Sequence, residues 1–575
     1  MRKLIVTSLF SALVFTSACK EPDPNRFETH VERIKSAESR SQGFSGLEKL
    51  TKTVLDAQDN KDLLDEFSSK VIPAFEAIYA DAEEQQEKML MLLRDVGRPE
   101  GAPVWNMALE LDGSSTGRKK VTIALDGIKK AKADGSVEKM VELFEAIIAK
   151  PSLDDSETDR GKVRLMLAET MGEIGDKRAV PVLIKAMEQT TEVQPVAVHR
   201  AAAKALGRIG DPSAVDALLT VTFRVPDAPT TTNIGVRSKQ ALASIGEPAV
   251  PKVLEMLRGD HTAVQELAAK NGVPQPVIQQ TAAGILGAMG VTSAVDDLVG
   301  FMPTDDCQPP DPKKKKKDDE EPDAEAAAAA GLRAVIGNAL GFIGDEKASE
   351  AICTCALTSD NPGDKFPLME ALGRIGGAKA VSCLNDVIKT GVYDTEIVRK
   401  EFKLEPRWDG ARFAILAATS AEIGSVKEAM AAASADATVA KEMKAWEAGV
   451  AVLESCKEDA GCYQKTLDDV NADWFAREKA AFELARLKKG DVATAESISK
   501  AFKVRNPDAR VSMAWLPMHM LEPGTKCGAC VEAIQGVIDA EKSSMDAKYQ
   551  ASVLRARETM AALRPTGASS APAAK

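Results

Sequence analysis

The chain has 575 residues, of which 44% are apolar and only 4% aromatic, and its formal net charge is −12. This acidic excess, with no concentrated basic face visible in the sequence, argues against nucleic-acid binding. A chain of this length usually forms several domains, unless it is built from repeats that extend in one direction.

Residues 1–18 have the features of a secretory signal. Arg2 and Lys3 precede an apolar run that is too short to cross a membrane, and small residues lead to Cys19. The ending "TSAC" resembles the lipobox of bacterial lipoproteins, whose cysteine is acylated and becomes the mature N-terminus. The resemblance implies a lipid on Cys19. Because Lys20 rather than Asp follows, it also implies the outer membrane of a bacterial envelope, on the periplasmic or surface face. A plain cleavable signal peptide is the alternative.

Residues 19–42 are polar and include two prolines, so we expect a tether between the lipid and the first helix. Helical repeats are expected over residues 43–302. A charged low-complexity loop follows at 303–325, where five lysines, Lys313 to Lys317, are neutralised by the acidic run after them. More divergent repeats are expected over 326–540, with a terminal helix and a disordered tail at 541–575.

The stretch "LGRIGDPSAVDALL" predicts a joint between two helices. Leu206 and Ile209 close one apolar stripe, and Gly210 supplies a left-handed residue that ends the helix. The carboxylate of Asp211 caps the next helix, where Pro212 is tolerated in the first turn. The stretch therefore predicts an antiparallel helix pair with a tight turn.

Similar phrases recur along the chain and predict an all-α solenoid of stacked antiparallel helix pairs. Successive glycines lie between 29 and 54 residues apart, which is the length of two helices with their turns. No segment has the alternating pattern of a strand. Besides Gly210, the predicted joints are at Gly97, Gly135, Gly175, Gly246, Gly290, Gly344, Gly376 and, more faintly, Gly424, Gly461 and Gly490.

The repeated pattern Gly-Asp-Pro/Lys-x-Ala-Val followed by Leu-Leu resembles the HEAT repeat in its short bacterial form, the phycocyanobilin-lyase type. The resemblance is strong between Met171 and Ile388. It implies a surface for binding other proteins, but the name describes repeat geometry and transfers no chemistry. Gly246 and Gly376 are not followed by Asp, so we expect looser turns there.

Eight cysteines remain after Cys19, an even number that an oxidising compartment can pair completely. Cys456 and Cys462 flank a predicted turn and suggest a bridge across one helix hairpin. Either of two cysteines in one repeat could reach the next repeat, and the loop cysteine could meet the one left over. These last candidates are Cys353 or Cys355 with Cys383, and Cys307 with the remaining member.

The sequence "CGAC", Cys527 to Cys530, lies at the start of a predicted helix, where a thiolate is stabilised. A structural disulfide is the favoured interpretation. A redox pair lacks the expected βαβ surroundings, and a metal site with His519 lacks a second C-x-x-C pair.

Evidence for catalysis is weak elsewhere. Of the four histidines, His199 and His261 are interpreted as surface or capping residues. No nucleophile-elbow, phosphate-loop or dinucleotide-binding pattern occurs, so we predict no catalytic residue, cofactor or metal.

The leading functional hypothesis is a lipid-anchored envelope scaffold that binds an unidentified protein partner without catalysis. The alternatives are an enzyme-associated, bilin-lyase-like or thiol-redox protein using Cys527 and Cys530, and a purely structural envelope spacer. In HEAT-like arrays the second helices line the concave side. The candidate partner-surface positions are therefore Lys185, Asp216, Lys252, Glu255, Asp296, Asp297, Glu350, Asn385 and Asp386.

Overall fold

The computed structural model describes residues 23–56, 61–148, 157–190, 193–224, 234–305, 307, 324–359, 362–390, 406–435, 437–522, 524–541 and 549–565. Within these ranges every regular element is helical and none is a strand. The predicted all-α class is therefore correct. The chain divides into unit 1, residues 1–139, and unit 2, residues 140–575.

Unit 1 packs short helices around a phenylalanine cluster. The ring of Phe67 meets that of Phe27 edge-on at 5.4 Å between centroids, and Phe75 stacks on Phe44 at 5.7 Å. Phe27 lies in the segment expected as a tether, so the chain is already folded there. The helices are α1 (Phe27–Lys35), α2 (Arg40–Asp56), α3 (Lys61–Glu66), α4 (Ile72–Ile78), α5 (Gln86–Val96), α6 (Ala102–Ala108) and α7 (Ser115–Ala131).

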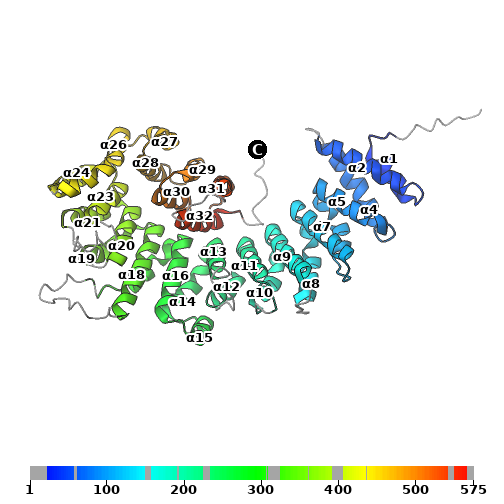
Figure 1. Ribbon diagram of the computed structural model, residues 1–575, viewed down its shortest axis with the longest axis horizontal. Helices are drawn as coiled ribbons and strands as arrows, with labels where there is room; N and C mark the ends of the chain where they lie inside the picture. The colour runs from blue at the N-terminus through cyan, green and yellow to red at the C-terminus, as the bar shows by residue number, and fades with distance from the viewer. Residues whose placement is uncertain are drawn as a thin grey trace, which may run out of the picture. The chain divides into compact units, whose positions relative to one another are not determined.

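Unit 2 begins within α8 (Val137–Ile148) and continues as two parallel rows of helices (Figure 1). The first helices of successive pairs stack on one another, and the second helices form the other row. The first row contains α9 (Glu157–Ile174), α11 (Val196–Ile209), α13 (Gly235–Ile245), α16 (Gln275–Met289), α18 (Ala324–Ile343) and α20 (Pro362–Ile375). The second row contains α10 (Val180–Glu188), α12 (Val215–Thr222), α14 (Val250–Arg258), α17 (Val295–Phe301), α19 (Ser349–Thr358) and α21 (Gly377–Thr390), with α15 (Thr262–Lys270) as an extra helix after α14.

The joint at Gly210 has the predicted geometry. Gly210 is left-handed with φ 73°, and the Asp211 carboxylate accepts a hydrogen bond from the backbone N–H of Ser213 at 2.9 Å. A short 3-10 turn, Pro212–Ala214, then leads into α12. At Gly246, which is not followed by Asp, no side chain caps the next helix. At Gly376, which also lacks the Asp, the following Gly377 takes a positive φ of 82° as well.

Three of the predicted joints were placed on the wrong residue. Gly135 lies in a 3-10 turn and Gly461 in a helix, whereas the left-handed residues nearby are Lys132 and Lys457. Gly424 lies within a helix. A lone glycine without the following Asp is therefore an insufficient joint signal, because glycine also occurs inside helices.

A second glycine in the repeated phrase explains how closely the first helices pack. A Cβ built on Gly207 would lie 2.6 Å from the Cα of Ala241 on the next first helix, and one on Gly287 would lie 2.7 Å from the Cα of Ala339. Only a glycine permits this approach between backbones. Where a phrase has a glycine three residues before the joint, as at Gly207 and Gly287, that glycine sets the spacing between repeats, while the later glycine forms the joint.

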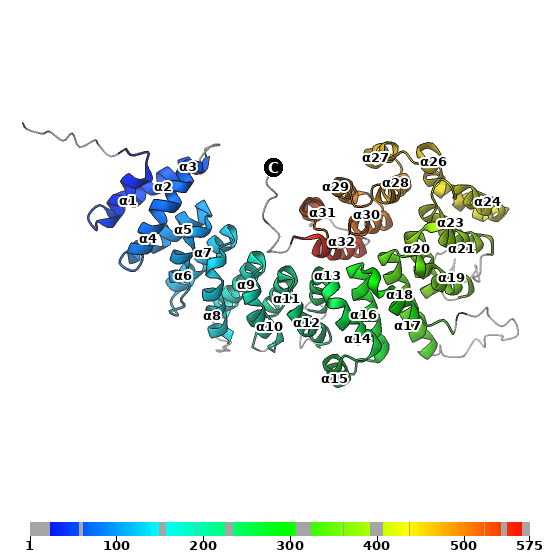
Figure 2. The same cartoon turned by 180° about the vertical axis from the view of Figure 1, so that it is seen from behind.

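The chain after α21 curves and returns over the first row (Figures 1 and 2). Helices α30 and α32 pack against α13, α16 and α18, a closure that the sequence did not predict. The helices of this part are α23 (Pro406–Ala417), α24 (Ile423–Ala433), α25 (Ala437–Met443), α26 (Glu447–Cys456), α27 (Ala460–Asp468), α28 (Trp474–Leu487), α29 (Val492–Lys500), α30 (Pro507–Met520), α31 (Gly528–Glu541) and α32 (Gln550–Leu563). We call α28 and α30 to α32 the C-terminal layer.

Phe342 at the end of α18 is the centre of this closure. The indole Nε1 of Trp515 donates a hydrogen bond to its carbonyl oxygen at 2.8 Å. The guanidiniums of Arg374 and Arg555 lie 4.0 and 3.5 Å from the centroid of its ring. Two cations on one aromatic ring, from α20 and α32, join the layer to the first row.

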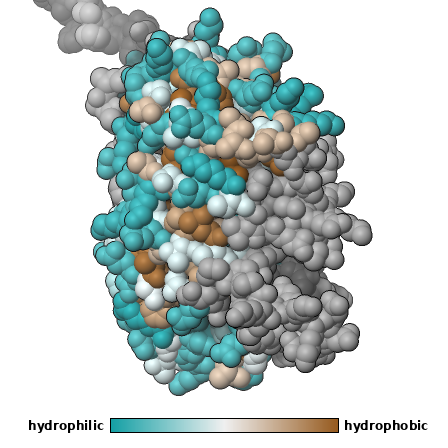
Figure 3. Space-filling view, turned by 90° about the vertical axis from the view of Figure 1, so that its left-hand side faces the viewer, coloured by the Kyte–Doolittle hydropathy of each residue, from teal (hydrophilic) through white to brown (hydrophobic). Residues whose placement is uncertain are grey.

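A buried polar cluster joins α23, α28 and α30 where the chain turns back. Arg412 on α23 bonds both carboxylate oxygens of Glu478 on α28, and Ser512 on α30 donates to the same carboxylate at 2.6 Å. These polar groups are almost fully buried, and removal of one partner would leave an unpaired charge. The outer surface nearby is mostly hydrophilic, with small and separated apolar areas on the face shown in Figure 3.

Candidate functional site

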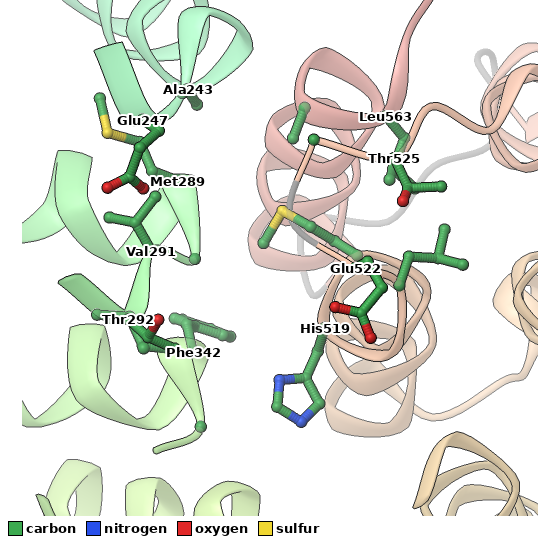
Figure 4. A pocket seen from close by; sticks show the side chains of 18 of the residues that line it. Ala243, Glu247, Met289, Val291, Thr292, Phe342, His519, Glu522, Thr525 and Leu563 are labelled. Carbon is green, nitrogen blue, oxygen red and sulfur yellow. The ribbon is translucent and has the colours of Figure 1, made fainter. Parts of the chain in front are cut away.

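A cavity of about 900 Å³ lies between the joints of the first row and the C-terminal layer. Its first wall is formed by the turns at Gly246, Gly290 and Gly344, and its second wall by the end of α30 and the segments beside α32. Figure 4 shows Glu247, Met289, Val291 and Thr292 on the first wall, facing Glu522, Thr525 and Leu563 on the second. We call this cavity the joint cleft.

The joint cleft combines apolar side chains with an excess of carboxylates. Glu247, Asp345, Glu346 and Glu522 line it, against the lysines Lys489 and Lys526. The Lys526 ammonium donates to the carbonyl oxygen of Ala562 at 2.8 Å, and burial lowers its pKa. Glu247 accepts a hydrogen bond from the Ser293 hydroxyl at 2.6 Å. The cleft therefore favours cationic over anionic groups.

His519 supports the wall of the joint cleft. Its imidazole stacks on the ring of Trp515 at 4.6 Å and lies against Gly344, where any Cβ would collide with it. Burial lowers its pKa to about 4, so the ring is neutral at pH 7. Within the part of the chain that the structure describes, no three His, Cys, Asp or Glu residues could hold a metal ion, so a site formed with Cys527 and Cys530 finds no support.

Cys527 and Cys530 lie in bonding position, with 5.3 Å between their Cα atoms. Both residues are buried, with relative exposures of 1% and 0%. The backbone N–H of Cys527 donates to the carbonyl oxygen of Leu563 at 2.8 Å, so the pair joins the start of α31 to the end of α32. A thiolate must reach a sulfur atom to exchange with it, so this burial favours a structural role.

The other six cysteines among the described residues also lie in pairs. Cys456 lies opposite Cys462 at 5.3 Å between Cα atoms, as proposed for a bridge across one hairpin. The structure resolves the choice between Cys353 and Cys355, because residues two apart on a helix point to different sides. Cys353 on α19 pairs with Cys383 on α21 at 5.8 Å, and the buried Cys355 pairs with Cys307 at 4.9 Å.

The predicted surface or capping role is wrong for His199 and correct for His261. His199 is not at the surface: it is 3% exposed, and burial, with a smaller effect from Arg224, lowers its pKa to about 4. Small alanines surround it on α11, so the ring fills core volume. His261 caps α15, where its Nδ1 accepts from the backbone N–H of Val264 at 3.4 Å, and its Nε2 lies 3.1 Å from Asp216.

The candidate partner-surface positions lie on the second helices. In unit 2 the chain curves over the first helices, so these positions are on the outer side and not on the inside of the curve as expected (Figures 1 and 2). Many of them tie neighbouring elements together. Lys252 bonds Glu255, Asp216 contacts His261, Asp297 pairs with Arg258, Glu350 with Lys379, Asp386 with Lys389, and Asn385 bonds Ser425. Lys185 and Asp296 are exposed, and neither has an ion pair among the described residues. Their role as a partner surface stays a prediction.

Several predicted features lie outside the described residues. These are the signal segment, Cys19, the lysine run Lys313 to Lys317 and the tail from residue 566 onwards. Among the helices that are described, none combines the length and apolar character required to cross a bilayer.

These features define an α-solenoid of stacked helix pairs. A family model described as HEAT repeats matches residues 151–229, the stretch that contains α9 to α12. No curated protein sequence matches the chain.

Solved structures with similar folds include human deoxyhypusine hydroxylase in complex with glycerol, at 16% identity and a TM-score of 0.20, covering 57% of this chain and 97% of that one. They also include Kap121p, at 12% identity and a TM-score of 0.29, covering 92% of this chain and 66% of that one. Kap121p bound to RanGTP matches at 13% identity and a TM-score of 0.23, with 93% and 74% covered. Scores this low carry no information on function.

Proposed function

We propose that this chain is a lipid-anchored envelope HEAT-repeat protein that acts as a non-catalytic scaffold for a protein partner. HEAT repeats are typical of surfaces that bind other proteins, and the joint cleft supplies a concave place on such a surface. The observation that carries the proposal is a cleft with apolar walls and an excess of carboxylates over lysines.

The lining of the joint cleft indicates what kind of segment it would take. Apolar side chains such as Met289, Val291 and Leu563 can receive one apolar side chain of a partner. The carboxylate of Glu522 has no hydrogen bond or ion pair with a described residue and lies on the second wall, where a cationic neighbour would pair with it. We therefore propose a partner segment in which Lys or Arg flanks an apolar residue.

The lipid anchor is part of the same proposal and rests on the sequence around Cys19. The four cysteine pairs support it indirectly, because disulfides persist in oxidising compartments such as the bacterial periplasm. Cys19→Ala should remove the protein from the membrane fraction, with loss of the lipid mass. A Cys19→Ala protein that stays in membranes after a high-salt wash, at unchanged mass, contradicts the anchor.

Site-specific photocrosslinking in intact cells tests the scaffold role. In three separate variants, a crosslinking residue replaces Thr292 in the joint cleft, Asp296 on the second row of helices, or the exposed Val470 as a distant control. A partner captured from Thr292 but not from Val470 supports the joint cleft. Capture only from Asp296 assigns binding to the second helices, and capture from neither position favours the structural spacer.

A further inference from the structure

A second cleft in unit 2 has the opposite charge. It has a volume of about 440 Å³ and lies between the first helices α11 and α13 and the returning helices α31 and α32. Asp539 is the one carboxylate among the described residues that line it. We call it the basic cleft, and its cations are Lys204, Arg208, Arg237, Arg557 and Arg564.

Most of this positive charge is not neutralised within the described structure. Arg208 pairs with Glu173 beside the cleft, and Arg237 donates to the side-chain oxygen of Gln240 at 2.9 Å. The side chains of Lys204, Arg557 and Arg564 have neither an ion pair nor a hydrogen bond to any described residue. Three unpaired cations therefore share one small space.

The cations also act on one another. Burial, together with the nearby charges of Arg208 and Arg564, lowers the pKa of Lys204 to about 8, although Glu173 acts in the opposite direction. Burial likewise lowers the pKa of Arg237, with the charge of Arg557 as the next cause. The empty cleft is thus electrostatically unfavourable, and an anion would relieve the repulsion.

Two buried hydrogen-bond donors at the basic cleft lack acceptors. Gln240 is 8% exposed, its oxygen is used by Arg237, and its Nε2 has no partner. The Nε of Arg208 is also buried without a partner. Buried donors are nearly always paired, so these two groups add unsatisfied polar hydrogens to the residues that line the basic cleft.

We propose that the basic cleft binds a small phosphorylated molecule with at least two negative charges. Guanidinium groups match phosphate oxygens in pairs, and four arginines with one lysine exceed what a single carboxylate requires. The volume suits a small ligand rather than a protein segment. Because the cations come from α11, α13, α32 and its C-terminal end, the bound molecule would brace the C-terminal layer against the first row. The basic cleft borders the joint cleft, with which it shares Ser244, but its proposed ligand does not depend on the scaffold proposal.

Calorimetric titration of the full-length mature protein with pyrophosphate, at constant ionic strength, tests the proposal. The variant Lys204→Gln/Arg557→Gln removes two unpaired cations. Lys270→Gln/Arg505→Gln removes the same charge from exposed positions elsewhere on unit 2. We expect one pyrophosphate per chain, with affinity at least roughly 30-fold weaker in the cleft variant and nearly unchanged in the control.

Three outcomes overturn the proposal: no binding by the unmodified protein, equal weakening in both variants, or citrate binding as tightly as pyrophosphate. Thermal melting without ligand distinguishes binding from folding. Because like charges repel in the empty cleft, Lys204→Gln alone should melt at the same temperature as the unmodified protein or higher. A clear fall would assign Lys204 to the fold instead.

Discussion

Replacement of Trp515 should release the C-terminal layer from the first row. Trp515 is fully buried, stacks on His519 and donates to the carbonyl oxygen of Phe342. Trp515→Ala removes the packing and the hydrogen bond together, at a cost of about 4 kcal/mol. Trp515→Phe keeps most of the packing and leaves the carbonyl unpaired, at about 1 to 2 kcal/mol.

Hydrogen exchange measured by mass spectrometry gives the local result. In Trp515→Ala we expect faster exchange in α30, α32 and the end of α18, with α10 and α12 unchanged. Trp105→Ala, which empties an equally buried site in unit 1, should leave exchange in α30 unchanged. If Trp515→Ala speeds exchange equally in α10 and α30, or in neither, the contact between Trp515 and Phe342 does not specifically hold the C-terminal layer on the first row.

Three further predictions concern packing, protonation and redox state. Gly287→Ala should lower the free energy of unfolding by about 1 to 3 kcal/mol in urea titrations, because the new Cβ meets the backbone of Ala339. Gly284→Ala on the same helix, where a Cβ meets nothing within 4 Å, should be neutral or stabilising. Equal effects of the two substitutions would refute the close approach at Gly287. His199 and His519 have pKa values lowered from 6.5 to about 4, so the unfolded chain takes up protons first, and stability present above about pH 6.5 should fall toward pH 4 by up to about 3 kcal/mol for each histidine. Urea titrations from pH 7.5 to 4.5 should show a shallower slope in His199→Gln, and an unchanged slope would contradict the buried neutral ring. In a graded glutathione series followed by alkylation and mass mapping, Cys456–Cys462 should open before the buried Cys527–Cys530, and free thiols at Cys456 in freshly isolated protein would exclude a structural bridge there.

The helix pairs and their joints could be predicted because they depend on neighbouring residues. Gly210 and Asp211 end one helix and begin the next within two positions, so the sequence contains the whole signal. The pairing of Cys456 with Cys462 is local in the same way.

The closure of unit 2 could not be predicted, because its contacts join distant segments. Trp515 and Phe342 are 173 residues apart, and nothing near either residue signals the other. The same is true of the basic cleft, where Lys204 and Arg557 come from opposite ends of unit 2. Cys353 and Cys355 lie on different faces of α19, and which of them meets Cys383 likewise depends on where α21 packs.

The return of α30 and α32 onto α13 and α16 has a mechanical consequence. An open stack of repeats is held only by contacts between neighbours, so it extends gradually under force and begins to unfold at its last repeat. In unit 2 the last helices are bonded to the middle of the row, so pulling on the chain from either side loads the contacts at Phe342 before it separates adjacent repeats. Unit 2 should therefore resist extension until the pulling force reaches one threshold, and then lengthen abruptly.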